Sequence, residues 1–343
     1  MTGVNSATPP RRRRLARVSA GLNRPDEQSD PSRISKVGNT IGKAVTWDGW
    51  LKLGAVVTAV GVLVGFWFTD HSLQATNRQI EASNRQLVLA QQTEITDRLA
   101  KAVEELDNQG LDARMGGIYL LGQLAHDSIE NRSVAFEIIG AYVRTHAAYP
   151  AEVPRQMDSY KCNSDGKITP DIQAALTVIG HRDSPAEEPV DLSETCLNYA
   201  QLMNLDFRNV DLTRSGLMNA EIKASTFVGS RFQDVSFVGA RTTDTDFRNA
   251  CFAGTILTYT SLTGDDLRGA TFDGGYLKRT GLTNVKVGST TLHAMDIRQT
   301  DLTGLDMSQV TVQDLFANDE NHWPPGFTPP PLTDRAGIAP GCQ

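Results

Sequence analysis

Apolar residues recur at every fifth position over a long C-terminal stretch of the chain. The twenty-five residues at this spacing, from Leu192 to Val312, are all hydrophobic except Thr242. All seven phenylalanines between residues 190 and 314 fall on the same register. A period of five fits neither the 3.6-residue period of an α-helix nor the two-residue alternation of a long strand. The pattern therefore predicts a coil with a corner in every repeat.

A second set of small or apolar residues lies two positions before these centres. It comprises Ala200, Leu205, Val210, Ala220, Val235, Ala240, Ala250 and Ala270. Residues two apart on an extended chain point the same way, so each unit places two side chains inward. The position two after the centre is rich in residues that tolerate turn conformations. Examples are Asn204, Asn209, Asn219, Gly229, Asp234, Gly239, Asp244, Asn249 and Gly254.

The phenylalanines indicate how many sides the coil has. If four units close one coil, residues twenty apart stack on each other. Six of the seven phenylalanines then form two ladders, namely Phe207, Phe227 and Phe247, and Phe232, Phe252 and Phe272. Stacking like residues in successive coils fills the core of a solenoid evenly. The sequence thus predicts a four-sided β-helix of about six coils, with these ladders in its core.

This region resembles the pentapeptide-repeat family, whose pattern A(D/N)LXX is nearly matched by Val210-Asp-Leu-Thr-Arg and Thr300-Asp-Leu-Thr-Gly. The resemblance implies a right-handed quadrilateral β-helix. The stretches that start at Thr96 and Asp112 look like the helical module that precedes the repeats in membrane-anchored bacterial members. The segment 322–327, His-Trp-Pro-Pro-Gly-Phe, resembles the tail that follows their last coil. The resemblance implies a fold and says little about an activity.

The N-terminal part contains a candidate membrane anchor. Residues 50–68 are apolar with one charge, Lys52, and aromatic residues lie at both ends. This length and these ends are typical of a transmembrane helix. We predict a transmembrane helix over 46–70, preceded by a basic disordered tail over 1–45. The run Arg11–Arg14 in the tail suits anionic lipid headgroups or the orientation of the span.

Helical periodicity continues beyond the span. Residues 71–108 contain helix formers and no glycine or proline, which indicates a stalk helix. Apolar stripes predict helices over 111–126, 132–146 and 172–179. We therefore expect a small helical module and linker over 109–187. The β-helix then occupies 188–314, and a Pro-rich tail follows over 315–343.

Nothing in the sequence points to catalysis. A β-helix filled with Phe and Leu leaves no cavity for a catalytic site. The sequence has no P-loop, GxSxG or HExxH motif, and His181-Arg-Asp183 stands without the other kinase motifs. We expect no catalytic residues, no cofactor and no metal. The four cysteines show no zinc spacing and no disulfide framework, although Cys162 and Cys196 would be able to join the linker to the first coil in an oxidising compartment.

Two faces of the β-helix suggest different partners. On the face of the Phe207 ladder an Asp repeatedly has an Arg two residues later, as at Asp246 and Arg248. This balance argues against a DNA mimic that inhibits or protects a topoisomerase, which remains the alternative function, and nucleic acid is an unlikely partner. The face centred on Leu197 and Leu217 carries no charge over four coils. An exposed apolar stripe is either covered or binds something. Its candidate residues are Tyr199, Met218, Val238, Ile256, Tyr259 and Tyr276.

These observations predict a single-span protein of the cell membrane that acts as a scaffold for a protein partner. The partner's identity and the oligomeric state do not follow from the sequence. Arg33, Lys36 and Lys43 precede the span and Arg78 and Arg85 follow it, so the positive-inside rule places the repeats outside the cytoplasm. The family resemblance implies cytoplasmic repeats. The sequence alone therefore does not decide on which side of the membrane the repeats lie.

Overall fold

The computed structural model describes residues 47–150, 166–182 and 189–333. By internal contacts the chain divides into two units, with the division between Asn84 and Arg85. The predicted basic tail over 1–45 lies outside the described residues.

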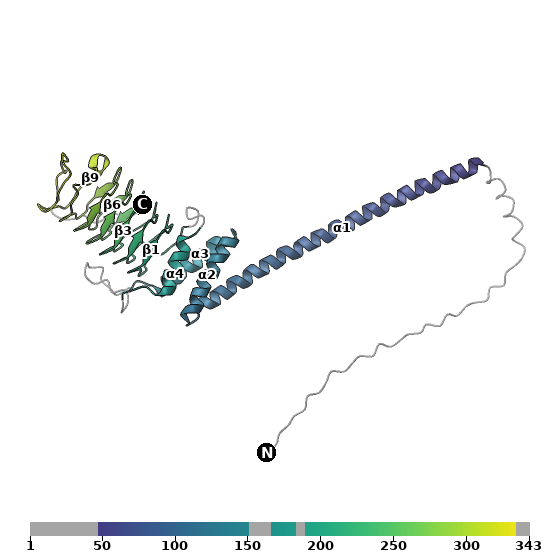
Figure 1. The fold of residues 1–343 in the computed structure, drawn as a ribbon, viewed down its shortest axis with the longest axis horizontal. Helices are drawn as coiled ribbons and strands as arrows, with labels where there is room; N and C mark the ends of the chain where they lie inside the picture. Colours follow the sequence, from purple (N-terminus) through teal and green to yellow (C-terminus); the bar gives the residue numbers. More distant parts are fainter. Residues whose placement is uncertain (1–46, 151–165, 183–188, 334–343) are drawn as a thin grey trace, which may run out of the picture. The chain divides into compact units, whose positions relative to one another are not determined.

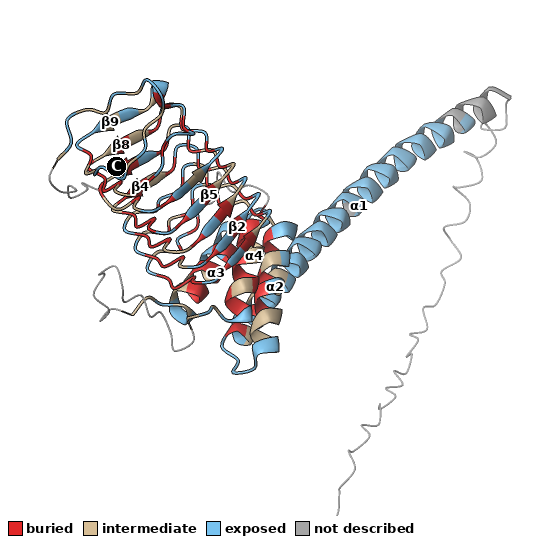
Figure 2. Cartoon of the chain, turned by 60° about the vertical axis from the view of Figure 1, so that its left-hand side comes forward, coloured by how far each residue is buried: buried red, intermediate tan, exposed pale blue. Residues whose placement is uncertain are grey.

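The first unit contains most of helix α1, which begins at Trp47 and continues to Leu106. From Val56 to Phe68 its large apolar side chains are between 52% and 72% exposed. Figure 2 shows this helix as exposed along this stretch. Among the described helices it is the one that is long and apolar enough to cross a membrane. An apolar helix whose side chains are exposed has the surface that a lipid environment requires.

The second unit begins with the end of α1 and three further helices. These are α2 (Leu111–Asp127), α3 (Arg132–His146) and α4 (Pro170–Gly180). The apolar stripes predicted all three to within two residues, because each stripe faces a shared core. That core is fully buried and includes Ile118, Leu121, Ile139, Ile172 and Ile179.

After the helices the chain winds into a parallel β-solenoid (Figure 1). One face carries β1 (Gln201–Met203), β2 (Glu221–Lys223), β3 (Arg241–Thr243), β5 (Ser261–Thr263) and β7 (Gly281–Thr283). A second face carries β4 (Cys251–Ala253), β6 (Thr271–Asp273), β8 (Thr291–His293) and β9 (Thr311–Gln313). Gln201 lies opposite Glu221, and Glu221 lies opposite Arg241. Each coil therefore takes twenty residues and has four sides, which confirms the prediction.

Both predicted phenylalanine ladders lie in the core. The ring centroids of Phe207 and Phe227 are 5.1 Å apart, and those of Phe252 and Phe272 are 4.5 Å apart, both in stacked geometry. The two ladders touch edge to face, with Phe247 and Phe252 5.7 Å apart. Such aromatic pairs stabilise a core by about 0.5–1.5 kcal/mol beyond the area that they bury.

The predicted corner positions adopt the left-handed backbone conformation. The φ angle is 56° at Asn204 and 54° at Asp234. Asn, Asp and Gly enter this region at a lower cost than other residues, which explains their enrichment there. The corner composition therefore has a direct conformational cause.

The helical module covers the open end of the first coil. The backbone N–H of Asp206 donates to the carbonyl of Gly180 at 2.7 Å. The side chain of Gln173 forms hydrogen bonds with both backbone groups of Gln201, at 2.8 and 3.0 Å. Apolar residues of α2, α3 and α4 form one continuous buried cluster with the first coils. The module thus acts as the N-terminal cap that a solenoid requires.

At the other end the coil continues past residue 314, where the sequence predicted a tail. The N–H of Phe316 donates to the carbonyl of Met295, and the N–H of Leu302 donates to the carbonyl of His322 at 2.8 Å. Trp323 and Phe327 then stack with ring centroids 5.5 Å apart and pack against the core. The segment beginning at Phe316 therefore forms part of a further coil that covers the last one.

The interior contains one polar pair that the repeat pattern does not show. The hydroxyl of Thr242 donates to Oδ2 of Asp265, and it also has a longer contact, of 3.4 Å, with the carbonyl of Ser261. Asp265 occupies the second inward position of its unit and is fully buried. Thr242 therefore has a polar partner in the next coil, which the repeat pattern of single positions does not show.

Candidate interaction surface

The Asp–Arg face, which comprises the outward positions of the units centred on Phe207, Phe227, Phe247 and Leu267, is internally neutralised. Nη2 of Arg208 lies 2.6 Å from Oδ2 of Asp206, and the same geometry recurs between Arg248 and Asp246 at 2.7 Å. Arg268 and Asp266 form a third such pair at 2.6 Å.

Each guanidinium engages both oxygens of its carboxylate, so these acids do not present free negative charge. For example, Nε of Arg268 donates to Oδ1 of Asp266 at 2.8 Å and Nη2 donates to Oδ2 at 2.6 Å. A phosphate mimic needs unpaired negative charge along its face. The geometry of this face therefore disfavours DNA mimicry.

The uncharged face comprises the outward positions of the units centred on Leu197, Leu217, Phe237 and Leu257, and its residues differ in exposure. Tyr199 is 44% exposed and Tyr259 is 57% exposed. Met218, Val238 and Tyr276 are half-buried, whereas Ile256 is 8% exposed. Among these six residues, the exposed surface is therefore concentrated on the two tyrosine rings.

Part of this face contacts other described segments. The Nζ of Lys167, which precedes α4, lies 5.8 Å from the centroid of the Tyr199 ring. Arg279 donates a hydrogen bond to the hydroxyl of Tyr259, and its guanidinium lies 5.5 Å from the ring centroid. Both tyrosines thus carry a cation on the ring, a favourable contact of about 0.5–1 kcal/mol at exposed sites. Lys167 comes from a different segment and cannot be found from the register, whereas Arg279 stands twenty residues after Tyr259, in the coil that follows the four uncharged ones.

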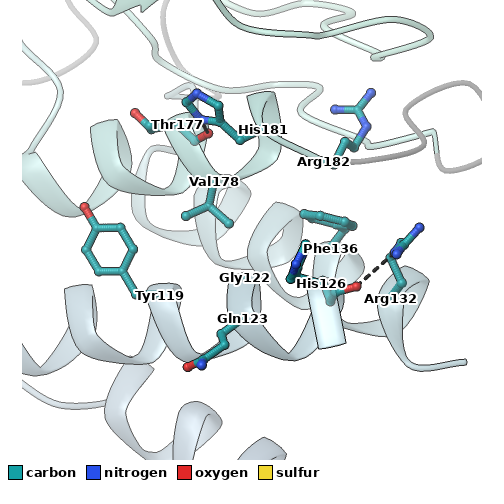
Figure 3. A pocket seen from close by; sticks show the side chains of 11 residues that line it. Tyr119, Gly122, Gln123, His126, Arg132, Phe136, Thr177, Val178, His181 and Arg182 are labelled. Atoms are coloured by element: carbon teal, nitrogen blue, oxygen red, sulfur yellow. Dashed lines mark hydrogen bonds between the residues drawn. The ribbon is translucent and has the colours of Figure 1, made fainter. Parts of the chain in front are cut away.

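The helical module has a cavity of about 260 Å³ between α2, α3 and α4 (Figure 3). Its wall includes His126, Arg132 and Phe136. Nε of Arg132 donates to the carbonyl of Ala125 at 2.9 Å, so this arginine contributes to the local backbone structure. Within the described ranges, no three His, Cys, Asp or Glu side chains come close enough to hold a metal ion.

Arg182, which belongs to the short match to a kinase motif, has a structural role. Arg182 is 4% exposed, and its Nη1 donates to the carbonyl of Ile179 at 3.1 Å. Its Nη2 donates to the carbonyl of Arg208 at 2.6 Å. Arg182 therefore joins the end of α4 to the first coil, while Asp183 of the same motif lies outside the described residues.

A buried ionic cluster connects the three module helices. Oδ2 of Asp171 on α4 accepts from Nε of Arg114 on α2 at 2.7 Å and from the hydroxyl of Tyr142 on α3 at 2.6 Å. Burial disfavours the charge, but hydrogen bonds from Thr169, Tyr142 and Arg114 outweigh it and lower the pKa of the Asp171 carboxyl to about 2. Burial also raises the pKa of Tyr142 to about 12. Asp171, Arg114 and Tyr142 are hydrogen-bonded to one another, and each lies on a different helix. The cluster therefore stabilises the helical module that caps the solenoid.

The cysteines differ from the sequence-based expectation. Cys196 and Cys251 are both disulfide-bonded. The expectation that the four cysteines form no disulfide framework was wrong, because spacing along the sequence does not report distances across coils. The predicted partner of Cys196, Cys162, lies outside the described residues.

Comparison with known proteins agrees with the coil geometry. Residues 225–264 and 245–284 match the family model for pentapeptide repeats, with eight copies. The chain carries a pentapeptide-repeat domain. No curated protein matches the chain.

Solved structures similar to parts of this chain include QnrB1 and two pentapeptide-repeat proteins. A trypsin-treated variant of QnrB1, a plasmid-mediated fluoroquinolone resistance protein, is 16% identical over 43% of this chain and 83% of QnrB1, with a TM-score of 0.30. The thylakoid-lumen protein AT2G44920 from Arabidopsis thaliana is 26% identical over 29% of this chain and 60% of that protein, with a TM-score of 0.18. Rfr23 from the cyanobacterium Cyanothece 51142 is 17% identical over 36% and 64% of the two chains, with a TM-score of 0.15.

Proposed function

We propose that this chain is a membrane-tethered pentapeptide-repeat scaffold that associates with another protein and performs no catalysis. The observation that carries the tether is the run of exposed apolar side chains on α1 from Val56 to Phe68. A soluble helix of this kind would leave a large apolar surface in water, which is unfavourable.

The scaffold role rests on how the pentapeptide-repeat domain distributes its side chains. Its core is filled by stacked rings and aliphatic residues, so the outward positions are what it presents to other molecules. Both ends of the coil are covered, by the helical module and by the segment from Phe316 to Phe327. A capped solenoid with varied outward residues is an architecture suited to binding a protein along its side.

Within this proposal, Tyr199 and Tyr259 are the contact residues on the uncharged face. Tyrosine is enriched at protein interfaces because its ring buries a large area while its hydroxyl stays satisfied. Ile256 acts in packing, because it is already buried.

The tether is tested by fractionating cells that express the intact chain. We expect the protein to stay in the membrane pellet after an alkaline carbonate wash. A matched variant with Val57, Val60, Leu63 and Val64 replaced by Ser is expected to appear in the soluble fraction. Recovery of the unaltered chain in the soluble fraction would refute the tether.

The association is tested by placing a photo-crosslinking amino acid at Tyr259 of the membrane-bound chain. Asn249 is the matched control, since it is exposed, adopts a similar φ of 57° against 61° at Tyr259, and lies on the Asp–Arg face. We expect a discrete crosslinked protein from position 259 and none from position 249. A Tyr259→Asp change is expected to abolish association while lowering stability by no more than about 1 kcal/mol, the size of its contact with Arg279, whereas Ile256→Asp lowers stability by more. Equal crosslinking at both positions would contradict the assignment of the face.

A further inference from the structure

Both cysteines in the solenoid are disulfide-bonded, at outward positions of different faces. Cys196 immediately precedes the core residue Leu197, on the uncharged face. Cys251 opens strand β4, next to the core residue Phe252. Core packing does not explain why cysteine stands at these two outward positions. The disulfides themselves therefore call for an explanation.

The register shows that Cys196 and Cys251 do not bond to each other. Cys196 pairs with Gly216, Gly216 with Ser236, and Ser236 with Ile256. Ile256 therefore lies three coils above Cys196, or about 14 Å at ~4.8 Å per coil. Cys251 belongs to the unit just before Ile256, whereas disulfide-bonded residues have Cα atoms about 4.4–6.8 Å apart. The chain thus has two separate disulfides, one at Cys196 and one at Cys251.

The two disulfides indicate that the solenoid lies in an oxidising compartment. Disulfides form and persist in oxidising environments and are rare in the cytosol, where thiols are kept reduced. A pentapeptide-repeat domain that uses every cysteine in a disulfide is therefore expected outside the cytoplasm.

The charge around the span gives the same orientation independently. Arg33, Lys36 and Lys43 precede the span and Lys52 lies at its start, whereas Arg78 and Arg85 follow within a similar distance. By the positive-inside rule the more basic flank stays in the cytoplasm. The segment after the span, with the repeats, then lies on the opposite side.

We infer that the basic N-terminal tail is cytoplasmic and that the pentapeptide-repeat domain lies on the non-cytoplasmic side of the membrane. Its protein partner is consequently a protein exposed in that compartment. This inference rests on the proposed tether, and it replaces the cytoplasmic placement that the family resemblance implies.

The experiment uses the full chain in sealed right-side-out and inside-out membrane vesicles. One variant carries Lys223→Cys on an exposed position of β2, and a matched variant carries Ser6→Cys in the N-terminal tail. Cys196 and Cys251 are disulfide-bonded, and the labelling of each variant is compared with that of the unaltered chain. Each preparation is treated with a membrane-impermeant maleimide reagent, and a parallel sample is solubilised first.

We expect K223C to be labelled in right-side-out vesicles and S6C in inside-out vesicles, with both labelled after solubilisation. In the unaltered chain, denatured under thiol-trapping conditions, we expect no labelling until a reductant is added. Labelling of K223C from the cytoplasmic face, or free thiols at Cys196 and Cys251, would overturn the inference. Loss of the chain from vesicles after a carbonate wash would instead refute the tether, so the two failures are distinguishable.

Discussion

The hydroxyl of Thr242 donates a hydrogen bond to the carboxyl of Asp265, and both side chains lie inside the solenoid. Elsewhere a Ser or Thr at the second inward position donates to a carbonyl in the preceding coil, as Thr255 does to Phe232 at 2.6 Å. Asp265 occupies the same position and accepts instead. The one polar residue among the repeat centres is therefore matched by an inward-facing acid in the next coil.

This pair makes the stability of the domain depend on pH. Burial raises the pKa of Asp265 to about 6, against about 3.9 in an unfolded chain. The folded state therefore holds the proton more tightly. The contribution of the protonated carboxyl is fully present below about pH 4 and is lost as the pH rises through about 6, a change of about 3 kcal/mol. We expect Asp265→Asn to raise the free energy of unfolding at pH 7 by up to this amount and to have little effect at pH 4.

Urea unfolding of the solubilised chain at both pH values measures this effect. Asp234→Asn is the control, because Asp234 is an exposed corner residue and asparagine is common at corners. A stability gain for Asp265→Asn that is equal at pH 4 and pH 7 would show that the buried carboxyl does not titrate as described.

Replacing Thr242 alone is predicted to destabilise the core. Thr242→Leu restores the repeat pattern but removes the hydroxyl that donates to Asp265. A buried acceptor left without its partner costs about 1–3 kcal/mol. Combining Thr242→Leu with Asp265→Ala removes both polar groups and should recover part of this loss, since the N–H of Thr245 then loses its acceptor, Oδ1 of Asp265. Thermal unfolding of the two single variants and the double variant gives the coupling energy, and additive effects would argue against a direct interaction.

Disrupting the buried cluster in the helical module is predicted to unfold the cap. Asp171→Ala leaves Arg114 and Tyr142 without their shared acceptor, and breaking a buried ion pair costs about 3–5 kcal/mol. The lowered pKa of Asp171 contributes stability above about pH 4 that is lost as the pH falls toward about 2. Hydrogen exchange should show faster opening of α2, α3 and α4. Exposed Asp112→Ala is the control, and an equal effect there would contradict the prediction.

Gly275 is required by a close backbone approach. A Cβ on Gly275 would lie 2.3 Å from the carbonyl oxygen of Thr255, and its φ of 95° disfavours any other residue. We expect Gly275→Ala to lower the free energy of unfolding by about 2 kcal/mol or more, from steric overlap and backbone strain. Gly304→Ala is the matched control, since a Cβ there meets no atom within 4 Å. Similar melting temperatures for both variants would refute this account.

The sequence by itself determined the repeat, the number of sides, both phenylalanine ladders, the corner positions and the module helices. Each depends on a period along the chain, and a side chain's direction follows directly from that period. The apolar run near the N-terminus predicted the candidate span in the same way. The polar pair of Thr242 and Asp265 was missed, although Asp265 stands on an inward position of the register.

Only the tertiary structure decided the relationships between segments distant in sequence. It showed that α4 closes the first coil, that Phe316 begins a further coil, and that cations lie over Tyr199 and Tyr259. It also showed that Cys196 and Cys251 are bonded. These features depend on distances between coils and capping segments. A five-residue period fixes which way each side chain points within a coil, but not which chain segment packs against it.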